Sequence, residues 1–251
     1  MVHLDEPTGL VLASMPVDAV LCDHSAAQVH GLWLPPGDVP VRVCVPGRPV
    51  EPRRRPHSRR TALRYRRREL RPEDVTVVDG VPVTSLARTW IDLAELVRPA
   101  DLVAVGDSVL RSGAALDELD DQVQRAGRRR GVVRARTVLP HLDRRSRSRP
   151  ESCMRYELVS AGLPKPEVNE PVIVGGEWIG EPDLLYRRQR IALEYQGDAH
   201  ADVSRMRKDI TRRLDFGDVD WLVIEAGPNE VFRHPERLVH LVRFEYDRRT
   251  R

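Results

Sequence analysis

Three acidic residues in the second half of the chain stand at a spacing that could hold a metal ion. Glu151 opens a helical pattern, Asp183 follows a proline, and Glu194 lies in an apolar run of strand length. Carboxylate oxygens are the ligands that Mg²⁺ prefers in proteins. A bound divalent ion lowers the pKa of a coordinated water, which can then attack a phosphodiester. These residue types therefore point to hydrolysis of nucleic acid.

The segments around Asp183 and Glu194 predict that the two carboxylates meet. The runs 178–186 and 190–197 are apolar and strand-like, and the polar residues between them read as a hairpin turn. A hairpin centred on that turn places Asp183 opposite Glu194. Facing residues of an antiparallel pair have Cβ atoms roughly 5 Å apart. Like charges held so close repel each other unless a cation lies between them.

We expect the ion to be Mg²⁺ or Mn²⁺, held by Asp183 and Glu194 with the backbone carbonyl of Tyr195 nearby. Glu151 would hold a water or a second ion. Gln196 shares a strand face with Glu194 and would align the attacking water. Plainer interpretations remain open, because Glu151 could form a surface ion pair, the two strand carboxylates could face solvent, and Gln196 could be an ordinary polar residue.

The surrounding segments read as one compact unit of helices and strands. They are a helix from Ser148 to Gly162, a strand at 168–174, a Gly175-Gly176 turn, the two strands above, a helix at 201–216, a strand at 221–224 and a closing helix at 235–246. Up to the last strand, this order is αβββαβ.

Residues 148–226 resemble the PD-(D/E)-x-K nuclease superfamily, in particular the domain related to very-short-patch repair endonucleases. The resemblance rests on Ser148-Arg149-Pro150-Glu151 through Arg155, Gly162-Leu163-Pro164, Pro166, Asn169, Pro182-Asp183, Glu194-Tyr195-Gln196-Gly197, His200, Asp209, Arg212 and Trp221. It implies that Glu151, Asp183 and Glu194 surround a metal ion. Position 196 departs from the family pattern, because Gln196 stands where a lysine or an acidic residue is usual.

Three residues of the expected helix at 201–216 and its approach would lie at the periphery of this site. They are His200, Asp209 and Arg212. His200 could instead cap its helix, and Asp209 could join a helical ion-pair network with neighbouring arginines.

The first half of the chain resembles the antitoxin-like region of AbiEi-type abortive-infection proteins over roughly residues 15–145. The matching segments are Leu21 to Ala27, His30-Gly31-Leu32 and Asp79 to Ser85, followed by Arg88-Thr89 and Asp92. The resemblance implies a cognate toxin or another defence-system protein as partner. About fifteen residues precede the region, and we expect them to be too few for a winged helix. Within it we expect strands at 41–45 and 74–78 and helices at 26–32, 85–96, 103–110 and 116–125.

Arginines gather in two places, although the total charge is only +3, from 41 basic and 38 acidic residues. Residues 53–68 hold nine arginines and no acid, and residues 125–149 hold ten arginines and one acid. We expect DNA phosphates to be contacted by Arg53, Arg54, Arg55, Arg144 and Arg145. A solvated basic surface is the alternative for both runs.

Cysteine usage and hydropathy suggest where the protein works. Cys22, Cys44 and Cys153 are scattered and form no CxxC pair, so neither a disulfide framework nor a zinc site is indicated. No apolar run approaches about 18 residues, and the start of the chain lacks the basic residues of a signal peptide. The expectation is a cytoplasmic protein that does not contact membranes.

Together these patterns predict an α+β protein with two domains. A mixed α/β region at 1–146 precedes a restriction-endonuclease-like αβββαβ core at 147–251, and an exposed linker at 140–150 joins them. The expected function is magnesium-dependent cleavage or nicking of DNA in repair or phage defence. The alternative is a non-catalytic protein, nucleic-acid-binding or antitoxin-like, with a degenerate nuclease fold.

Overall fold

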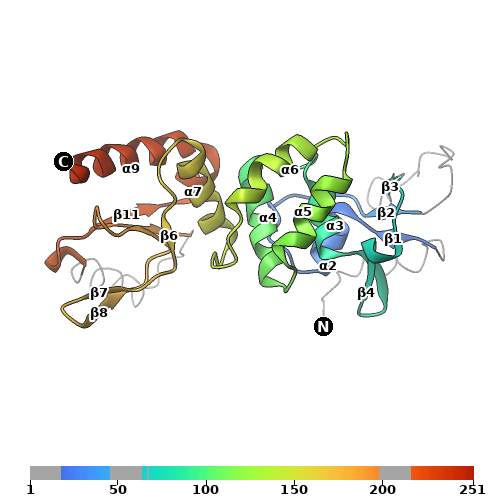
Figure 1. Ribbon diagram of the computed structural model, residues 1–251, viewed down its shortest axis with the longest axis horizontal. Coiled ribbons are helices and arrows are strands. Elements are labelled where there is room, and N and C mark those ends of the chain that lie inside the picture. Colours follow the sequence, from blue (N-terminus) through green and yellow to red (C-terminus); the bar gives the residue numbers. More distant parts are fainter. Residues whose placement is uncertain (1–17, 46–63, 67, 198–215) are drawn as a thin grey trace. The chain divides into compact units, whose positions relative to one another are not determined.

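The computed structural model of the chain describes residues 18–45, 64–66, 68–197 and 216–251. Its contacts divide the chain into two compact units, Met1–Leu142 and Asp143–Arg251. Each unit combines helices with strands (Figure 1). The α+β class is therefore confirmed. In the described residues, no helix is both long enough and apolar enough to cross a membrane.

The first unit is built on a mixed sheet of five short strands. They are β1 (Val20–Leu21), β2 (Arg42–Cys44), β3 (Arg64–Arg66), β4 (Val75–Val78) and β5 (Val81–Thr84), in the spatial order β3-β2-β1-β5-β4. The central strand β1 pairs antiparallel with β2 and parallel with β5. Leu21 of β1, Val43 of β2 and Val83 of β5 are fully buried. They pack with Ala26 and Val29 into one apolar cluster.

Helices cover this sheet and pack on one another. They are α2 (Asp23–Val29), α3 (Leu86–Leu93), α4 (Pro99–Arg111), α5 (Leu116–Arg125) and α6 (Val132–Val138), with short 3₁₀ turns at Pro72–Asp74 and Leu139–His141. The central helix is α3, which contacts α2, α4 and α5. Its Trp90 is fully buried and donates its indole N–H to the carbonyl of Leu102 at 3.1 Å. That bond satisfies the ring's one polar group.

Most elements expected in the first unit are present. The helix expected at 116–125 has those bounds in the structure. The helix expected at 26–32 instead begins three residues earlier, at Asp23, and ends at Val29. Asp23 takes a left-handed backbone conformation, with φ of +53°. A non-glycine residue seldom adopts this conformation, so periodicity alone did not place the start of the helix there.

The second unit combines one mixed sheet with a separate hairpin and two longer helices. Its elements are α7 (Arg149–Ser160), β6 (Glu167–Val168), β7 (Val172–Val174), β8 (Glu177–Gly180), β9 (Leu184–Tyr186), β10 (Ile191–Tyr195), β11 (Leu222–Ala226), the short π-helix η3 (Asn229–Arg233) and α9 (Pro235–Thr250). The sheet order is β11-β10-β9-β6, and β7 pairs with β8 across the Gly175-Gly176 turn. The strand β10 is antiparallel to β9 and parallel to β11.

Two expected strands are each split in the structure. The run 178–186 is interrupted between β8 and β9 at residues 181–183, and the run 168–174 is interrupted between β6 and β7. Pro182 and Pro171 stand in the two interruptions, and proline cannot donate to a strand ladder. Asn169 has a φ of +50°, which also breaks extended structure. The helix expected at 201–216 lies, apart from its last residue, outside the described residues.

The segment expected to be an exposed linker, 140–150, is only partly exposed. Leu142, Asp143 and Ser146 are buried, and the boundary between the two units falls after Leu142. Asp143 accepts hydrogen bonds from the backbone and side chain of Arg145 and pairs with Lys165 at 3.1 Å. These contacts attach the start of the second unit to its own core, so the prediction of a fully exposed linker is wrong.

A glycine before α6 gives a test of packing in the first unit. At Gly131 the φ is +84°, and an added Cβ would lie 2.4 Å from the backbone nitrogen of Glu95. We expect Gly131→Ala to destabilise this unit by about 1–2 kcal/mol from the left-handed conformation and by a further 1–3 kcal/mol from overpacking. Gly127→Ala is the matched control, because Gly127 also has positive φ but meets nothing within 4 Å. Equal losses of protection from amide hydrogen exchange in the two variants would contradict the close approach.

Candidate functional site

The hairpin formed by β9 and β10 has the register that the sequence predicts. Its pairs are Ile191–Tyr186, Ala192–Leu185 and Leu193–Leu184. One further step in this register places Asp183 opposite Glu194, just beyond the last pair. Asp183 also accepts a hydrogen bond through Oδ2 from the backbone nitrogen of Tyr195 at 2.7 Å. That bond fixes the Asp183 carboxylate against the end of β10.

Glu151 lies in the first turn of α7, where its carboxylate caps the helix. Its Oε2 accepts from the backbone nitrogen of Arg147 at 2.8 Å, and its Oε1 accepts from the Ser148 hydroxyl at 2.8 Å. The Ser148 hydroxyl in turn accepts from the backbone nitrogen of Glu151 at 3.4 Å. Reciprocal contacts of this kind satisfy backbone donors at a helix start. Glu151 therefore has a local structural role that its reading as a metal ligand did not include.

Asn169 connects Glu151 to the strand that carries Asp183. Its side-chain nitrogen donates to Oε2 of Glu151 at 2.9 Å and to the carbonyl of Arg145 at 2.9 Å. Its backbone nitrogen donates to the carbonyl of Asp183 at 3.0 Å. Asn169 is one of the residues that carry the nuclease resemblance, but the sequence does not indicate its role. Hydrophobic periodicity cannot predict a polar side chain that connects two separate elements.

The contacts of Asn169 hold the two expected ligand positions in one arrangement. The bond from its backbone nitrogen to Asp183 extends the pairing of β6 with β9. The buried start of α7 and the start of β9 are thus joined through a single residue. Asn169 consequently positions both Glu151 and Asp183. The Glu151 carboxylate caps α7, whereas the Asp183 carboxylate accepts from the backbone of Tyr195.

The remaining residues of the expected metal site lie around the end of β10. Glu194 and Gln196 are both half-buried, and the backbone nitrogen of Gln196 donates to the carbonyl of Ala226 at 2.9 Å. The Tyr195 ring meets the edge of Phe232 at a centroid distance of 6.2 Å. The expected peripheral residues, His200, Asp209 and Arg212, fall outside the described residues.

The carboxylates of this region fit a divalent ion only in part. Asp183 and Glu194 supply oxygen ligands at neighbouring positions, as Mg²⁺ or Mn²⁺ requires. Glu151 already accepts three hydrogen bonds within the protein. Among the residues that the structure describes, no three His, Cys, Asp or Glu side chains form a group that could hold a metal ion. A site built on Asp183 and Glu194 would therefore draw further ligands from water or from substrate.

The arginines expected to contact DNA differ in how the structure uses them. Arg53, Arg54 and Arg55 lie outside the described residues. Arg145 pairs with Asp143 at 2.9 Å and with Glu170 at 3.1 Å, and its hydrogen bond to Asp143 raises the pKa of the guanidinium. The neighbouring Arg144 is exposed. Any phosphate contact by Arg145 would have to compete with two carboxylates of the same unit.

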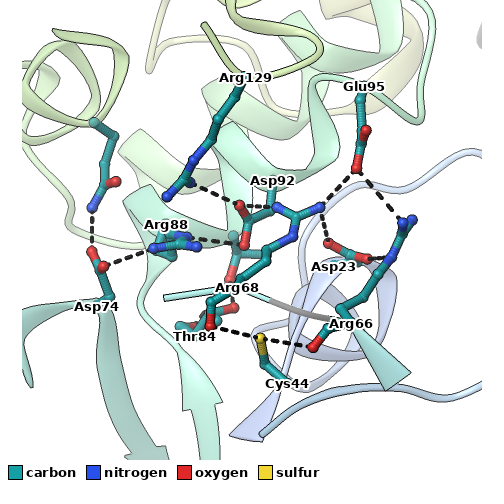
Figure 2. Close-up of polar contacts among 12 residues, drawn as sticks. Asp23, Cys44, Arg66, Arg68, Asp74, Thr84, Arg88, Asp92, Glu95 and Arg129 are labelled. Carbon is teal, nitrogen blue, oxygen red and sulfur yellow. Dashed lines mark hydrogen bonds and ion pairs between the residues drawn. The ribbon is translucent and has the colours of Figure 1, made fainter. Parts of the chain in front are cut away.

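A second group of charged residues lies at the centre of the first unit (Figure 2). We call it the ionic cluster; it comprises Asp23, Arg42, Arg66, Arg68, Asp74, Arg88, Asp92, Glu95 and Arg129. Its members come from the start of α2, from β2, from β3 and the segment after it, from the 3₁₀ turn at Pro72–Asp74, from α3 and the residues after it, and from the connection between α5 and α6. Asp23, Arg88 and Asp92 are almost completely buried. Charges buried to this degree are stable only when paired.

Arg68 connects α2 to α3 within the ionic cluster by pairing with carboxylates from both regions. Its guanidinium forms ion pairs with Asp92, with Glu95 at 2.8 Å and with Asp23 at 3.3 Å. Burial disfavours the charge of Arg68, but the three carboxylates outweigh it, so the pKa of the guanidinium is raised. Arg66 approaches Asp23 from the other side at 3.0 Å. The strained backbone of Asp23 is thus held in place by its carboxylate.

Arg88 extends the ionic cluster from α3 toward α5. Its Nε donates to Asp92 at 3.0 Å and its Nη1 donates to Asp74 at 2.7 Å. Asp74 also accepts from the Gln122 side chain at 2.8 Å. Burial alone would raise the pKa of Asp74, but the hydrogen bonds that it accepts, chiefly from Gln122, hold the pKa below its ordinary value. Arg88 therefore ties three elements together inside the unit.

The sequence pointed to parts of the ionic cluster without revealing their pairing. Arg88 and Asp92 stand in a segment that carries the AbiEi resemblance, and their i, i+4 spacing allows an ion pair on one helix face. Arg66 and Arg68 belong to the basic run that was expected to contact phosphates. In the structure both side chains pair with carboxylates of their own unit, so this part of the run is not simply a solvated basic surface.

Comparisons with known proteins give a family match within the first unit and two relatives whose alignments are longer than that unit. The family model of the AbiEi antitoxin C-terminal domain matches residues 19–141, which include every member of the ionic cluster. The chain is also 32% identical over 173 residues to two uncharacterized proteins of Mycobacterium tuberculosis, MT2308 of strain CDC 1551 / Oshkosh and Rv2248 of strain ATCC 25618 / H37Rv. In each case the alignment covers 68% of this chain and 64% of the relative. No solved structure gives a significant match.

The burial of the ionic cluster predicts a large effect of removing one charge. We expect Arg88→Met to destabilise the first unit by about 3–5 kcal/mol, because it leaves the buried Asp74 carboxylate without a cation and removes one of the guanidiniums that pair with Asp92. The control is Arg71→Met, since Arg71 pairs with Glu73 at 3.7 Å and the two side chains are 61% and 52% exposed. That exposed pair should contribute only about 0–1 kcal/mol. Similar destabilisation in both variants, measured by amide hydrogen exchange, would show that burial of the cluster is not the decisive factor.

Proposed function

We propose that this chain is an antitoxin-like protein and that its first unit acts by binding a macromolecular partner. The observation that carries the proposal is the match of residues 19–141 to the AbiEi antitoxin C-terminal domain. The matched segment corresponds to the five-stranded sheet, helices α2 to α6 and the ionic cluster. A match over this framework supports a shared mode of action, because it includes the whole sheet and the helices that pack on it.

The ionic cluster suits a binding module better than a catalytic centre. Its buried carboxylates, Asp23, Asp74 and Asp92, each pair with at least one arginine. Carboxylates paired in this way fix the positions of helices and strands. A rigid framework of this kind can present a constant surface to a partner, since little side-chain entropy is lost on binding. The partner class that the family description supports is a toxin protein.

The proposal is tested by neutralisation of toxicity in a bacterial host. Proteins encoded beside this chain in its own genome are induced one at a time, with and without the full chain. We expect one of them to inhibit growth and the full chain to restore it. Arg88→Met should abolish the rescue because it disrupts the first unit, whereas Arg71→Met, at an exposed ion pair, should rescue as the wild type does. Failure of the chain to relieve any inhibition would contradict the antitoxin-like function.

A second candidate function is supported by one observation in the second unit. The register of β9 and β10 brings Asp183 opposite Glu194, as a site for Mg²⁺ or Mn²⁺ would require. When bound, such an ion would supply an activated water for phosphodiester hydrolysis. Asp183 and Glu194 would hold the ion beside the Tyr195 carbonyl, Asn169 and Glu151 would position Asp183, and Gln196 would orient the water. The substrate would be DNA.

The second candidate is tested by incubation of the full chain with plasmid and linear duplex DNA in Mg²⁺ or Mn²⁺. We expect Asp183→Asn to abolish cleavage because it removes a negative charge from the ion's ligands. Asp220→Asn should leave cleavage unchanged, since Asp220 is exposed and pairs with Arg190. Arg190 lies at the turn of the β9–β10 hairpin, at the opposite end from Asp183 and Glu194. Gln196→Lys should retain or raise activity, because an ammonium can stabilise transition-state charge.

Each outcome of the cleavage test separates the two candidates. A wild-type protein that cleaves nothing with either metal would leave the second unit without the proposed activity. Growth rescue by Asp183→Asn would then remain the expected result, because the antitoxin-like function belongs to the first unit. Loss of rescue in Asp183→Asn, with folding intact, would mean that the first unit does not act alone.

A further inference from the structure

A cavity of about 530 Å³ lies in the first unit beside the ionic cluster. Its lining combines four arginines with an aromatic side chain, an aliphatic side chain and two glutamates. Pockets that bind small molecules have volumes of roughly 300–1,000 Å³. The cavity is therefore large enough for a ligand of mononucleotide size, and its lining offers both cationic and apolar contacts.

Two arginines of the cavity are fixed in position by the ionic cluster. Arg68 is held by Asp92, Glu95 and Asp23, and its side chain is only 14% exposed. Arg66 is held by Asp23 at 3.0 Å and is 33% exposed. Figure 2 shows both guanidiniums converging on the same carboxylates. A guanidinium held in this way loses little freedom when it binds an anion, so the cavity is organised before a ligand arrives.

Two further arginines contribute cationic groups that the ionic cluster does not neutralise fully. Arg129 reaches Asp92 only at 3.7 Å and is 41% exposed. Burial and the neighbouring guanidiniums of Arg88 and Arg68 lower the pKa of Arg129, which means that its charge lacks full compensation. Arg130 is exposed and forms no ion pair with any residue in the described part of the chain. An anion bound here would relieve repulsion among these cations.

The other walls of the cavity favour a ligand with a planar ring. Tyr65 lines the cavity and is 44% exposed, so it can contribute an aromatic contact to a ligand. Ile91 is 5% exposed and adds a buried aliphatic contact. Stacking on an aromatic side chain accepts any nucleobase, because every base has a π-face. Guanidiniums bind phosphate oxygens through paired N–H donors.

We propose that this cavity binds a nucleotide with one or two phosphates, its phosphate on Arg129 and Arg130 and its base against Tyr65. Two glutamates in the lining, Glu69 and Glu95, disfavour a more highly charged ligand such as a nucleic-acid duplex. A carboxylate can instead accept hydrogen bonds from ribose hydroxyls or from a base amino group. Binding of a nucleotide does not depend on which macromolecule the antitoxin-like unit recognises.

The test is calorimetric titration of the full chain with adenosine monophosphate, guanosine monophosphate, adenosine and inorganic phosphate. We expect a nucleoside monophosphate to bind more tightly than either adenosine or phosphate, because only it engages the tyrosine and the arginines together. Arg129→Gln and Arg130→Gln should each weaken nucleotide binding by about 10-fold or more, since each removes a charged hydrogen-bond donor. Tyr65→Ala should weaken it by about 10-fold and leave phosphate binding unchanged.

Arg128→Gln is the matched control, because Arg128 is an exposed neighbour that does not line the cavity. Its affinity for nucleotide should equal that of the wild type. Thermal unfolding of Tyr65→Ala, Arg128→Gln and Arg130→Gln should match that of the wild type, since these side chains are exposed and lie outside the ionic cluster. A folded variant without binding then reports on the cavity itself.

Three results would overturn the proposal. If inorganic phosphate bound as tightly as the nucleotides, the cavity would be a simple oxyanion site that does not recognise the base. Equal weakening by Arg128→Gln and Arg130→Gln would indicate attraction to the general positive charge of the segment. Absence of nucleotide binding at millimolar ligand, with an acidic peptide bound in its place, would assign the cavity to a protein partner.

Discussion

The pairing of buried charges around Arg68 and Asp92 is the interaction on which the first unit depends. Arg68 follows the edge strand β3, whereas Asp92 lies in the central helix α3, so their ion pair connects the sheet to the helices. Asp23 brings the start of α2 into the same cluster. Each of these groups would be costly to bury alone, because an unpaired charge in a protein interior carries a large desolvation penalty. The charges therefore stabilise the unit jointly, and apolar packing at Leu21 and Trp90 surrounds them.

The same pairing explains how a cationic cavity can persist beside a buried core. The carboxylates behind Arg66 and Arg68 hold these guanidiniums in place, and the less compensated Arg129 and Arg130 remain available to a ligand. In the second unit, hydrogen bonds play the corresponding positioning role. Asn169 there links the start of α7 to the start of β9. Both units thus use fixed polar contacts to place groups that could bind a partner, a nucleotide or a metal ion.

Local pattern was enough to predict some features of the fold and of the candidate site. The polar turn after Tyr186 determined the register of β9 and β10, and with it the juxtaposition of Asp183 and Glu194. The apolar pattern alone continued through Pro182, although the proline itself, which has no backbone donor, marks the interruption of the strand. Local pattern was also insufficient for the ionic cluster. Arg66 and Asp23 are 43 residues apart, and no local period relates residues at that separation.

A double-mutant cycle of Arg68 and Asp92 tests the central claim most directly. Arg68→Met, Asp92→Asn and the double variant are compared with the wild type, and amide hydrogen exchange gives the free energy of unfolding of the first unit in the full chain. Each single change should leave a buried charge of the other sign undercompensated, whereas the double change removes both charges. The account predicts that the double variant loses less stability than the sum of the two single variants, by roughly 0.5–3 kcal/mol. Additive losses would contradict it, because the two side chains would then stabilise the unit independently of each other.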